Sequence, residues 1–342
     1  MNKKTKILAI SAVIIIIAAA LGATYVLSDK EELSVVYLNK SSYEALIVAD
    51  KKGFFDELSF KLGKHTVAGS GQNAVDTMLA GSADIAATGE GPAINAMNKC
   101  SDDIIILCSY DISTSAQIWV AQKSLIDDGK IIVEDNGPEE VAGYLKGSKF
   151  KVGIIEGSST EAMFKRWCDE YDVTYEGTNP DLNLKYLTGN TLASSFAEGE
   201  IDILAGSQPY PATVMEKSEA VAIGSSEDIG VRSTSVLITT KDNYEKKAEK
   251  MKEFVAAIKK ATDYMNDNKE EVVDICASSI EWSKAAQNAV LENSTPRVAF
   301  NESVIKIMYT TSEGKGFENR VTRDMISASC PLKEYIRELY GE

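Results

Sequence analysis

Short apolar runs alternate with helical segments along most of this 342-residue chain. The first run, 33–38, precedes a helical segment at 43–52, which stops at Gly53, a residue type that commonly ends helices. Alternation of strands and helices in this way predicts an α/β fold. The pattern continues with expected strands at 60–67, 84–87 and 104–108 and with expected helices at 73–80 and 92–99, the latter opening with Pro92.

A second set of strands and helices interrupts the first. Strand-like runs at 117–121 and 235–239 flank a segment with its own pattern. The strands expected within it are 150–155, 184–186 and 201–205, and the helices are 157–171 and 192–197. Because the chain crosses twice between two units, we predict two hinged lobes with a cleft between them. Lobe 1 is expected to comprise 29–118 and 236–342, and lobe 2, inserted in it, 119–235.

The last third of the chain is expected to be mostly helical. Asp242 is placed to cap a helix that runs to about residue 266. Apolar residues recur along this helix at helical spacing, which predicts that one of its faces packs on the sheet. These residues are Met251, Phe254, Val255, Ile258, Ala261 and Met265.

The N-terminal segment differs from the rest. Three lysines precede an uncharged apolar run at 7–27, which as a helix would span a hydrocarbon core of roughly 30 Å. Basic residues before such a run favour a cytoplasmic N-terminus and export of the chain beyond the run. We expect 1–28 to be an uncleaved membrane anchor; a cleaved signal peptide, with small residues at 18–23, and a buried helix are the alternatives.

The charge of the chain restricts its partners. The formal net charge is −15, and setting aside the three N-terminal lysines leaves −18 for the body. A body this acidic would repel nucleic acid and anionic lipid surfaces, so neither is expected as a partner. An anionic ligand would have to be held by local groups, because the overall field opposes it.

Histidine and cysteine usage limits catalytic and metal chemistry. His65 is the single histidine, which excludes a multi-histidine metal site, and we expect it on the surface beside a strand. The five cysteines contain no CxxC spacing, so neither a zinc site nor a thioredoxin-like motif is indicated. Cys100 and Cys108 are close enough in sequence for a disulfide, with buried free thiols as the alternative. We expect no metal and no cofactor.

Several short motifs carry a family resemblance. They are 49–55 (ADKKGFF), 69–71 with 78–86 (GSG and MLAGSADIA), 145–153 with 157–159 (LKGSKFKVG and GSS), and 208–210 (QPY). In this order and spacing the chain resembles the nitrate-, sulfonate- and taurine-type substrate-binding proteins of ABC importers and the related pyrimidine-precursor proteins. The resemblance covers about 33–268 and implies a periplasmic-binding-protein-like fold of type II. Gln208 stands where that family has a glutamate, and 281–342 matches none of its motifs.

The loops after the strands carry the candidate ligand contacts, since α/β proteins bind ligands beyond the carboxyl ends of their strands. The Gly-Ser-Ser turn at 157–159 offers backbone N–H groups and a helix dipole to an anion. Lys40 is the basic residue near these loops, whereas Glu90 and Asp111 would favour a cationic group on the ligand. The candidate residues are Tyr37, Ser41, Ser42, Ser70, Gln72, Thr88, Gly89, Glu90, Asp111, Thr114, Ser115, Ser158, Ser159, Thr160, Gln208 and Tyr210.

The resemblance implies an extracytoplasmic solute receptor and not an enzyme. Such a protein would bind a small anionic or zwitterionic solute, such as a sulfonate, taurine or nitrate, and deliver it to an ABC permease powered by a separate ATPase. We expect a monomer held at the membrane by its N-terminal helix, or secreted after cleavage. The alternatives are a membrane-anchored ligand sensor and a pyrimidine-precursor synthase, although such a synthase needs a reactive histidine and clustered cysteines.

Overall fold

The computed structural model describes residues 32–63, 65–100, 103–114, 117–217, 220–313 and 320–342. The expected anchor or signal segment, 1–28, and the candidate residue Ser115 lie outside the described residues. Among the helices that are described, none combines the length and the apolar character needed to cross a bilayer.

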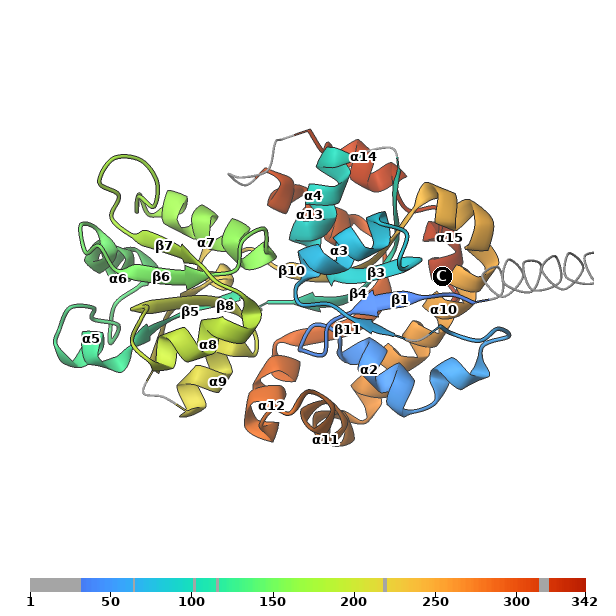
Figure 1. The fold of residues 1–342 in the computed structure, drawn as a ribbon, viewed down its shortest axis with the longest axis horizontal. Helices are drawn as coiled ribbons and strands as arrows, with labels where there is room; N and C mark the ends of the chain where they lie inside the picture. Colours follow the sequence, from blue (N-terminus) through green and yellow to red (C-terminus); the bar gives the residue numbers. More distant parts are fainter. Residues whose placement is uncertain (1–31, 64, 101–102, 115–116, 218–219, 314–319) are drawn as a thin grey trace, which may run out of the picture.

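Two sheets with helices on both faces make up the described chain, and they lie side by side (Figure 1). We call the part built on the six-stranded sheet lobe 1 and the part built on the five-stranded sheet lobe 2. The chain passes from lobe 1 to lobe 2 after strand β4 and returns before strand β10. The predicted α/β fold with two lobes, one inserted in the other, is therefore confirmed.

The sheet of lobe 1 has the strand order β11-β4-β10-β3-β1-β2. Strands β1, β2 and β3 are parallel, and β10 lies antiparallel between β3 and β4. The carboxyl ends of β1, β3 and β4 and the amino end of β10 therefore meet at one edge. The strands are β1 (Val35–Tyr37), β2 (Thr66–Val67), β3 (Ile85–Gly89), β4 (Ile104–Ser113), β10 (Ser233–Thr240) and β11 (Ser294–Ala299).

Helices cover both faces of this sheet, so its central strands are buried on both sides and consist of continuous apolar runs. Val236, Leu237 and Ile238 of β10 are fully buried. The apolar stripe predicted for the long helix α10 is buried in the same core, as expected. The helices of lobe 1 are α2 (Glu44–Lys51), α3 (Gly71–Leu79), α4 (Glu90–Lys99), α10 (Lys241–Asp267), α11 (Lys269–Ile280), α12 (Lys284–Glu292), α13 (Glu302–Ser312), α14 (Arg323–Ala328), α15 (Lys333–Glu338) and the 3₁₀ helix η1 (Phe54–Glu57).

The sheet of lobe 2 has the order β7-β6-β8-β5-β9, with β6, β7 and β8 parallel and β5 antiparallel to its neighbours. Its core contains Trp119, Phe164 and Trp167, whose rings contact one another. The strands are β5 (Gln117–Gln122), β6 (Lys151–Ile154), β7 (Asn183–Tyr186), β8 (Ile203–Ser207) and β9 (Ala220–Ser225). The helices are α5 (Lys123–Asp127), α6 (Pro138–Leu145), α7 (Ser159–Glu170), α8 (Gly189–Ala197), α9 (Tyr210–Lys217) and the 3₁₀ helix η2 (Ser226–Ile229).

Several element boundaries differ from the prediction. The strand expected at 60–67 is reduced to β2, an exposed two-residue edge strand, together with an isolated bridge at Leu62. The helix expected from Pro92 begins two residues earlier, at Glu90. Proline is tolerated in this first helical turn, because the N–H that it lacks would have no intrahelical partner. Thr240, and not Asp242, caps α10: its hydroxyl accepts a hydrogen bond from the N–H of Asn243 at 3.2 Å.

Other elements were not expected at all. Strand β11 pairs with the edge of β4 in a region predicted to be helical, and Pro296 is tolerated there because an edge strand leaves N–H groups unpaired. Strand β9 and helices α5, α6 and α9 were likewise not predicted. The lobe boundaries at 118/119 and 235/236 stay predictions; β5 begins at Gln117 and β10 at Ser233.

The five cysteines are free thiols, so the alternative of a disulfide between Cys100 and Cys108 is not realised. His65 lies beside β2 and is half-buried. Its ring stacks on the ring of Tyr37, with 3.5 Å between the ring centres. The histidine therefore has a packing role on the outer side of lobe 1.

Candidate functional site

A small cavity lies between the lobes, where the strand ends of both sheets face each other. Its volume is about 70 Å³, and a second hollow of about 40 Å³ adjoins it and shares Lys40, Ser70 and Ser158 with it. Room of this size holds only a handful of water molecules, at roughly 10–15 Å³ each. Any solute enclosed here must be small.

Three helices begin at the cavity wall. The starts of α3, α4 and α7 line it through Ser70, Glu90 and Ser159. Two of these starts are capped locally: Ser70 accepts a hydrogen bond from Asn73 N, and Ser158 from Glu161 N, each at 3.1 Å. The positive ends of three helix dipoles therefore point toward one small volume, which suits a negatively charged group on a ligand.

Glu90, the first residue of α4, is the most deeply buried acidic side chain of the cavity wall, with 1% of its surface exposed. Its Oε2 atom accepts a hydrogen bond from the backbone N–H of Thr234 at 3.1 Å. Its Oε1 atom has no hydrogen-bond partner among the described residues. Burial raises the pKa of Glu90 to about 7, although the Thr234 N–H and the nearby hydroxyls of Ser233 and Ser159 act in the opposite direction.

Asp111 supplies a second carboxyl group from the end of β4, with 9% of its surface exposed. Its Oδ1 atom accepts a hydrogen bond from the hydroxyl of Ser294 at 2.5 Å. Burial raises the pKa of Asp111 to about 6. The cavity therefore has two carboxyl groups that are costly to ionise without a cation beside them.

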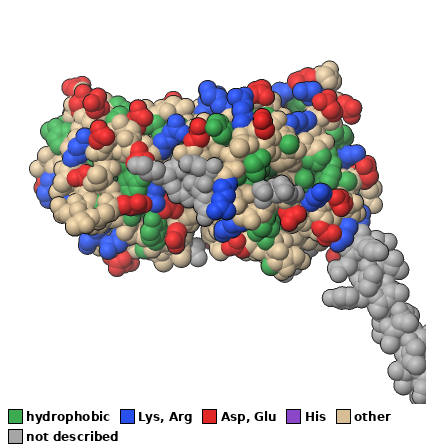
Figure 2. All heavy atoms as spheres, turned by 90° about the horizontal axis from the view of Figure 1, so that it is seen from above, with side chains coloured by type: hydrophobic (Ala, Val, Ile, Leu, Met, Phe, Trp, Pro, Cys, Tyr) green, Lys and Arg blue, Asp and Glu red, His purple; other side chains and the backbone are tan. Residues whose placement is uncertain are grey.

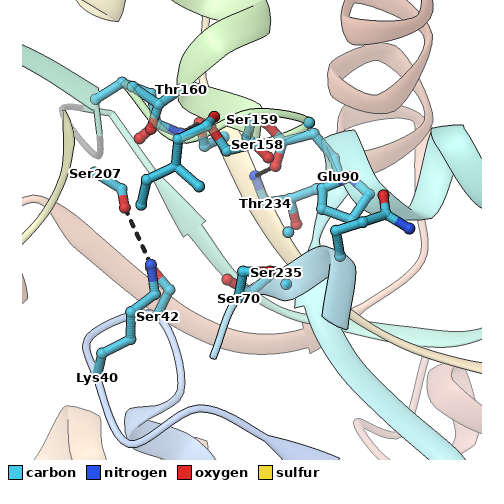
Figure 3. A pocket seen from close by; sticks show the side chains of 18 of the residues that line it. Lys40, Ser42, Ser70, Glu90, Ser158, Ser159, Thr160, Ser207, Thr234 and Ser235 are labelled. Atoms are coloured by element: carbon cyan, nitrogen blue, oxygen red, sulfur yellow. Dashed lines mark hydrogen bonds between the residues drawn. The ribbon is translucent and has the colours of Figure 1, made fainter. Parts of the chain in front are cut away.

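Lys40 is the one basic residue among the described residues that line the cavity. It is half-buried, and its Nζ atom donates a hydrogen bond to the hydroxyl of Ser207 at 3.2 Å. The same atom lies 5.5 Å from the centre of the Tyr210 ring. Burial lowers the pKa of Lys40 to about 8, and Glu44 opposes this shift. Lys40 and Glu90 lie on opposite sides of the pocket (Figure 3).

The two lobes contact each other around the cavity. The N–H of Gly91 in lobe 1 donates to the hydroxyl of Ser159 in lobe 2 at 3.1 Å. The hydroxyl of Ser41 donates to the backbone carbonyl of Gln208. With the contact between Lys40 and Ser207, these hydrogen bonds hold the strand ends of both lobes against one another, so the structure is a closed arrangement.

The C-terminal segment adds contacts between the lobes on either side of the cavity. The hydroxyl of Ser283, which caps α12, donates to Oε2 of Glu216 on α9 at 2.5 Å. On the other side, Nη1 of Arg166 on α7 donates to the carbonyl of Thr310 on α13 at 3.1 Å. The segment 281–342, which carries no recognised motif, thus completes lobe 1 and contacts lobe 2.

Ten of the sixteen candidate residues line the cavity or its adjoining hollow. They come from the helix starts and strand ends on which the prediction rested, and they bring both lobes to one site. These residues are Ser42, Ser70, Gln72, Gly89, Glu90, Asp111, Ser158, Ser159, Thr160 and Tyr210.

The remaining described candidates do not line the cavity. Tyr37 packs on His65 and lines a separate hollow on the outer side of lobe 1. Thr88 is fully buried and donates to the carbonyl of Gly71 at 3.2 Å. Ser41 and Gln208 contact each other between the lobes, and Thr114 reaches the carbonyl of Asn293 at 3.5 Å. Their hydroxyl and amide groups hold backbone segments together.

Several lining residues were not among the sixteen candidates, although Lys40 was noted as the basic residue near the loops. Half of them belong to β4, β5 and β10, the strands that connect the lobes, where a serine or threonine gives no local signal of a site. The run Ser233-Thr234-Ser235 at the start of β10 was the one available hint, since three hydroxyls together are unusual in a buried strand. The residues are Lys40, Tyr43, Ser113, Gln117, Ile155, Glu156, Ser207, Ser233, Thr234 and Ser235.

Charges of both signs are interspersed over the face of the molecule shown in Figure 2. The strongly negative overall charge is therefore not what distinguishes the site. The charged groups that the described residues place at the cavity are one lysine, two buried carboxyl groups and the exposed Glu156, beside three helix starts.

Comparisons with known proteins agree on the fold. The alkanesulfonate-binding protein SsuA from Xanthomonas axonopodis pv. citri, bound to MOPS, superposes with a TM-score of 0.69 at 14% identity, covering 88% of this chain and 98% of that one. The periplasmic nitrate-binding protein NrtA from Synechocystis PCC 6803 gives 0.66 at 14% identity, covering 90% and 88%. The desulfurization enzyme DSZB gives 0.58 at 11% identity, covering 91% and 99%.

At these identities the structural likeness shows a shared fold, and binding proteins and an enzyme both have it. A search among curated proteins finds no match. The family assignment therefore depends on the sequence match to a family model, which extends over residues 28–279 and so over most of the chain. On that match, the protein belongs to the NMT1-like family.

Proposed function

We propose that this protein is the extracytoplasmic solute receptor of an ABC importer. It binds a small anionic or zwitterionic solute, of the size of a sulfonate, taurine or nitrate, in the cavity between the lobes. The observation that carries the proposal is the cavity itself, a small polar space lined from both lobes, with three helix starts at its wall. Such a space encloses a ligand by closure of the lobes and requires no reacting group.

In this proposal, binding and closure form one process. The open protein admits the solute, which engages the helix starts of one lobe first. Closure then adds the groups of the other lobe and forms the contact between Gly91 and Ser159. The closed form delivers its solute to a membrane permease driven by a separate ATPase. A solute that contacts both lobes stabilises the closed form by its difference in affinity for the two forms.

The side chains at the cavity support binding better than catalysis. His65 lies on the outer side of lobe 1, and none of the cysteines lines the cavity among the residues described. A pyrimidine-precursor synthase would need such groups at the site. The likeness to a desulfurization enzyme lies in the fold, which binding proteins share.

The location and assembly of the protein are part of the same proposal. Export through the basic and apolar N-terminus places the body outside the cytoplasm, with 1–28 as a membrane anchor or a cleaved signal peptide. The receptor acts as a monomer, since its cavity is completed by its own two lobes.

The test is a thermal-shift screen of the purified full-length protein with taurine, ethanesulfonate, nitrate, bicarbonate and an aminopyrimidine. A solute at 100 times its Kd stabilises a protein by about 2.7 kcal/mol, which gives a clear rise in Tm. A shift with at least one small solute supports the receptor function, and no shift with any of them contradicts it. Mass analysis that finds a covalent change in the protein would support the synthase instead. A solute shift without stimulation of ATP hydrolysis by the reconstituted importer would favour a sensor.

A further inference from the structure

We infer that the solute carries a cationic group, an ammonium or amidinium, which binds between Glu90 and Asp111 while its anionic group lies toward Lys40 and the start of α7. This inference depends on the proposed function and specifies its ligand. It excludes nitrate and unsubstituted alkanesulfonates, which have no group to offer the two carboxylates, as the physiological solutes.

The positions of the two acidic residues follow from the sheet. Ser235 of β10 is paired with Gly89 on one side and with Asp111 on the other. Neighbouring strands lie about 4.8 Å apart, so the backbones of Gly89 and Asp111 are separated by roughly 10 Å. Thr234 joins them, because its N–H donates to Glu90 and its hydroxyl donates to the carbonyl of Asp111 at 2.8 Å. Both residues line the cavity from the two sides of this one strand.

Two fully buried acceptor atoms at the cavity wall have no donor among the described residues. Oε1 of Glu90 and Oε1 of Gln117 are both buried and have no partner among the described residues. Gln117 lies beside Glu90's neighbour Ser233 and donates to its hydroxyl at 2.6 Å. Buried acceptors without donors are rare in folded proteins, and an ammonium group brings three donors at once. The unpaired acceptor atoms therefore favour a ligand group with several hydrogen-bond donors.

The charge balance leads to the same group. No basic side chain among the described residues forms an ion pair with Glu90 or Asp111. Lys40 is engaged with Ser207 across the pocket (Figure 3). A buried carboxylate without a cation is costly, so the closed form needs a positive charge that the solute supplies.

The other end of the cavity favours the opposite charge, and the one further acidic residue among the described residues that line the cavity, Glu156, is exposed. Lys40, with the hydroxyls of Ser158 and Thr160 at the start of α7, lines both the cavity and the adjoining hollow. An anionic group placed there is stabilised by one ammonium and one helix dipole. With so little volume between the two ends, only a short spacer fits between the charges of the solute.

The experiment compares pairs of solutes that differ only in the cationic group. Taurine is paired with 2-hydroxyethanesulfonate, and β-alanine with 3-hydroxypropionate, with Kd measured by calorimetry on the full-length protein. In at least one pair we expect the ammonium compound to bind at least about 30-fold more tightly, the loss expected when one partner of a buried charge pair is removed. In Glu90→Gln this preference falls to less than about threefold, because the ammonium compound loses its charge partner while the hydroxyl compound binds as it does to the wild type.

Two further variants complete the design. Asp111→Asn is expected to weaken the ammonium compound selectively as well, and it serves if Glu90→Gln does not fold. Glu198→Gln, at an exposed position beyond the end of α8, removes a carboxylate away from the cavity and leaves all affinities unchanged. A carboxylate that only braced the fold would affect both members of a pair equally.

The outcomes separate this inference from the function on which it depends. Equal binding of ammonium and hydroxyl compounds, or equal loss of both in Glu90→Gln, overturns the inference and leaves the receptor function standing. Binding of nitrate or ethanesulfonate more tightly than any ammonium compound has the same meaning. No binding of any probe overturns the receptor function, and the inference with it.

Discussion

Two strand-to-helix turns face each other across the cavity, and they use one backbone device for different purposes. In lobe 1, β3 ends at Gly89 and α4 begins with Glu90. In lobe 2, β6 is followed by the Gly-Ser-Ser turn, and α7 begins with Ser159. Both turns direct a helix start at the ligand space. One of them adds a buried carboxylate, and the other adds hydroxyls and the exposed carboxylate of Glu156.

In the proposed receptor, this difference would give the two lobes different preferences for ligand charge. The hydroxyl side satisfies its helix start internally, since Ser158 accepts the N–H of Glu161. The carboxylate side has no side-chain cap at Gly89, and Glu90 instead takes an N–H from the neighbouring strand β10. Under the proposed function, the two helix starts attract an anionic group, while Glu90 restricts the solutes that lie against lobe 1.

The largest effect is expected from filling the space between the two turns with an added side-chain atom. A Cβ atom on Gly91 would lie 3.0 Å from the N and Cα atoms of Ser159, which are backbone atoms and cannot rotate away. In Gly91→Ala the lobes must therefore separate slightly, at a cost of about 1–3 kcal/mol to the closed form. Solute affinity should fall roughly 5- to 150-fold in calorimetry.

The fold itself should tolerate this change, because alanine is favoured over glycine within a helix. The Tm of the ligand-free variant should equal or exceed that of the wild type. Gly143 in α6 offers a matched control, since it is exposed and a Cβ there would meet no atom within 4 Å. Gly143→Ala should leave affinity unchanged, and wild-type affinity in Gly91→Ala would contradict closure through this contact.

The second effect concerns pH. The pKa of Glu90 is raised to about 7 and that of Lys40 is lowered to about 8 by burial. Binding of a cationic group needs the Glu90 carboxylate, so affinity should rise about tenfold per pH unit below 7, and it should fall above 8 as Lys40 loses its charge. Asp111, whose pKa is raised to about 6, adds to the acidic limb.

Stability of the ligand-free protein should move in the opposite direction over the acidic range. A carboxyl group whose pKa is raised by folding stabilises the protein at pH values below its pKa in the unfolded state. That contribution is lost as the pH rises through its pKa in the folded state. The Tm of the ligand-free protein should therefore decline toward pH 7 while the solute-induced shift grows. Glu90→Gln should flatten the acidic limb of affinity and Lys40→Met the alkaline limb; unchanged limbs would exclude these two residues as the titrating groups.

What was predictable from sequence depends on whether the signal is local. The helix starts at 70–72, 89–90 and 158–160 were found because glycine and serine before a helical run form a local pattern. The strand residues Ser113, Gln117 and Ser233 were missed. They reach the cavity only through pairings between residues that are distant in sequence: β10 inserts between β3 and β4, and β5 lies between β8 and β9.

The side of a strand or loop to which a residue points was the second limit. Tyr37 lies at the end of β1, as predicted, but its side chain points to His65 and not to the cavity. Successive residues of a strand face opposite sides, so an error of one position places a side chain on the wrong face. Thr88 and Ser41 likewise turn their hydroxyls to backbone carbonyls, which a loop sequence does not reveal.

The smallest expected effect separates two adjacent serines of the lobe 2 turn. Ser159 accepts the Gly91 N–H across the cavity, whereas Ser158 caps its own helix. One hydrogen bond contributes about 0.5–1.5 kcal/mol net, so Ser159→Ala should weaken solute binding roughly two- to twelvefold and leave the Tm of the ligand-free protein unchanged. Ser158→Ala should lower that Tm by removing a cap worth about 1 kcal/mol. If Ser159→Ala lowers the ligand-free Tm as much as Ser158→Ala does, the contact with Gly91 belongs to the ligand-free fold and not to closure on the solute.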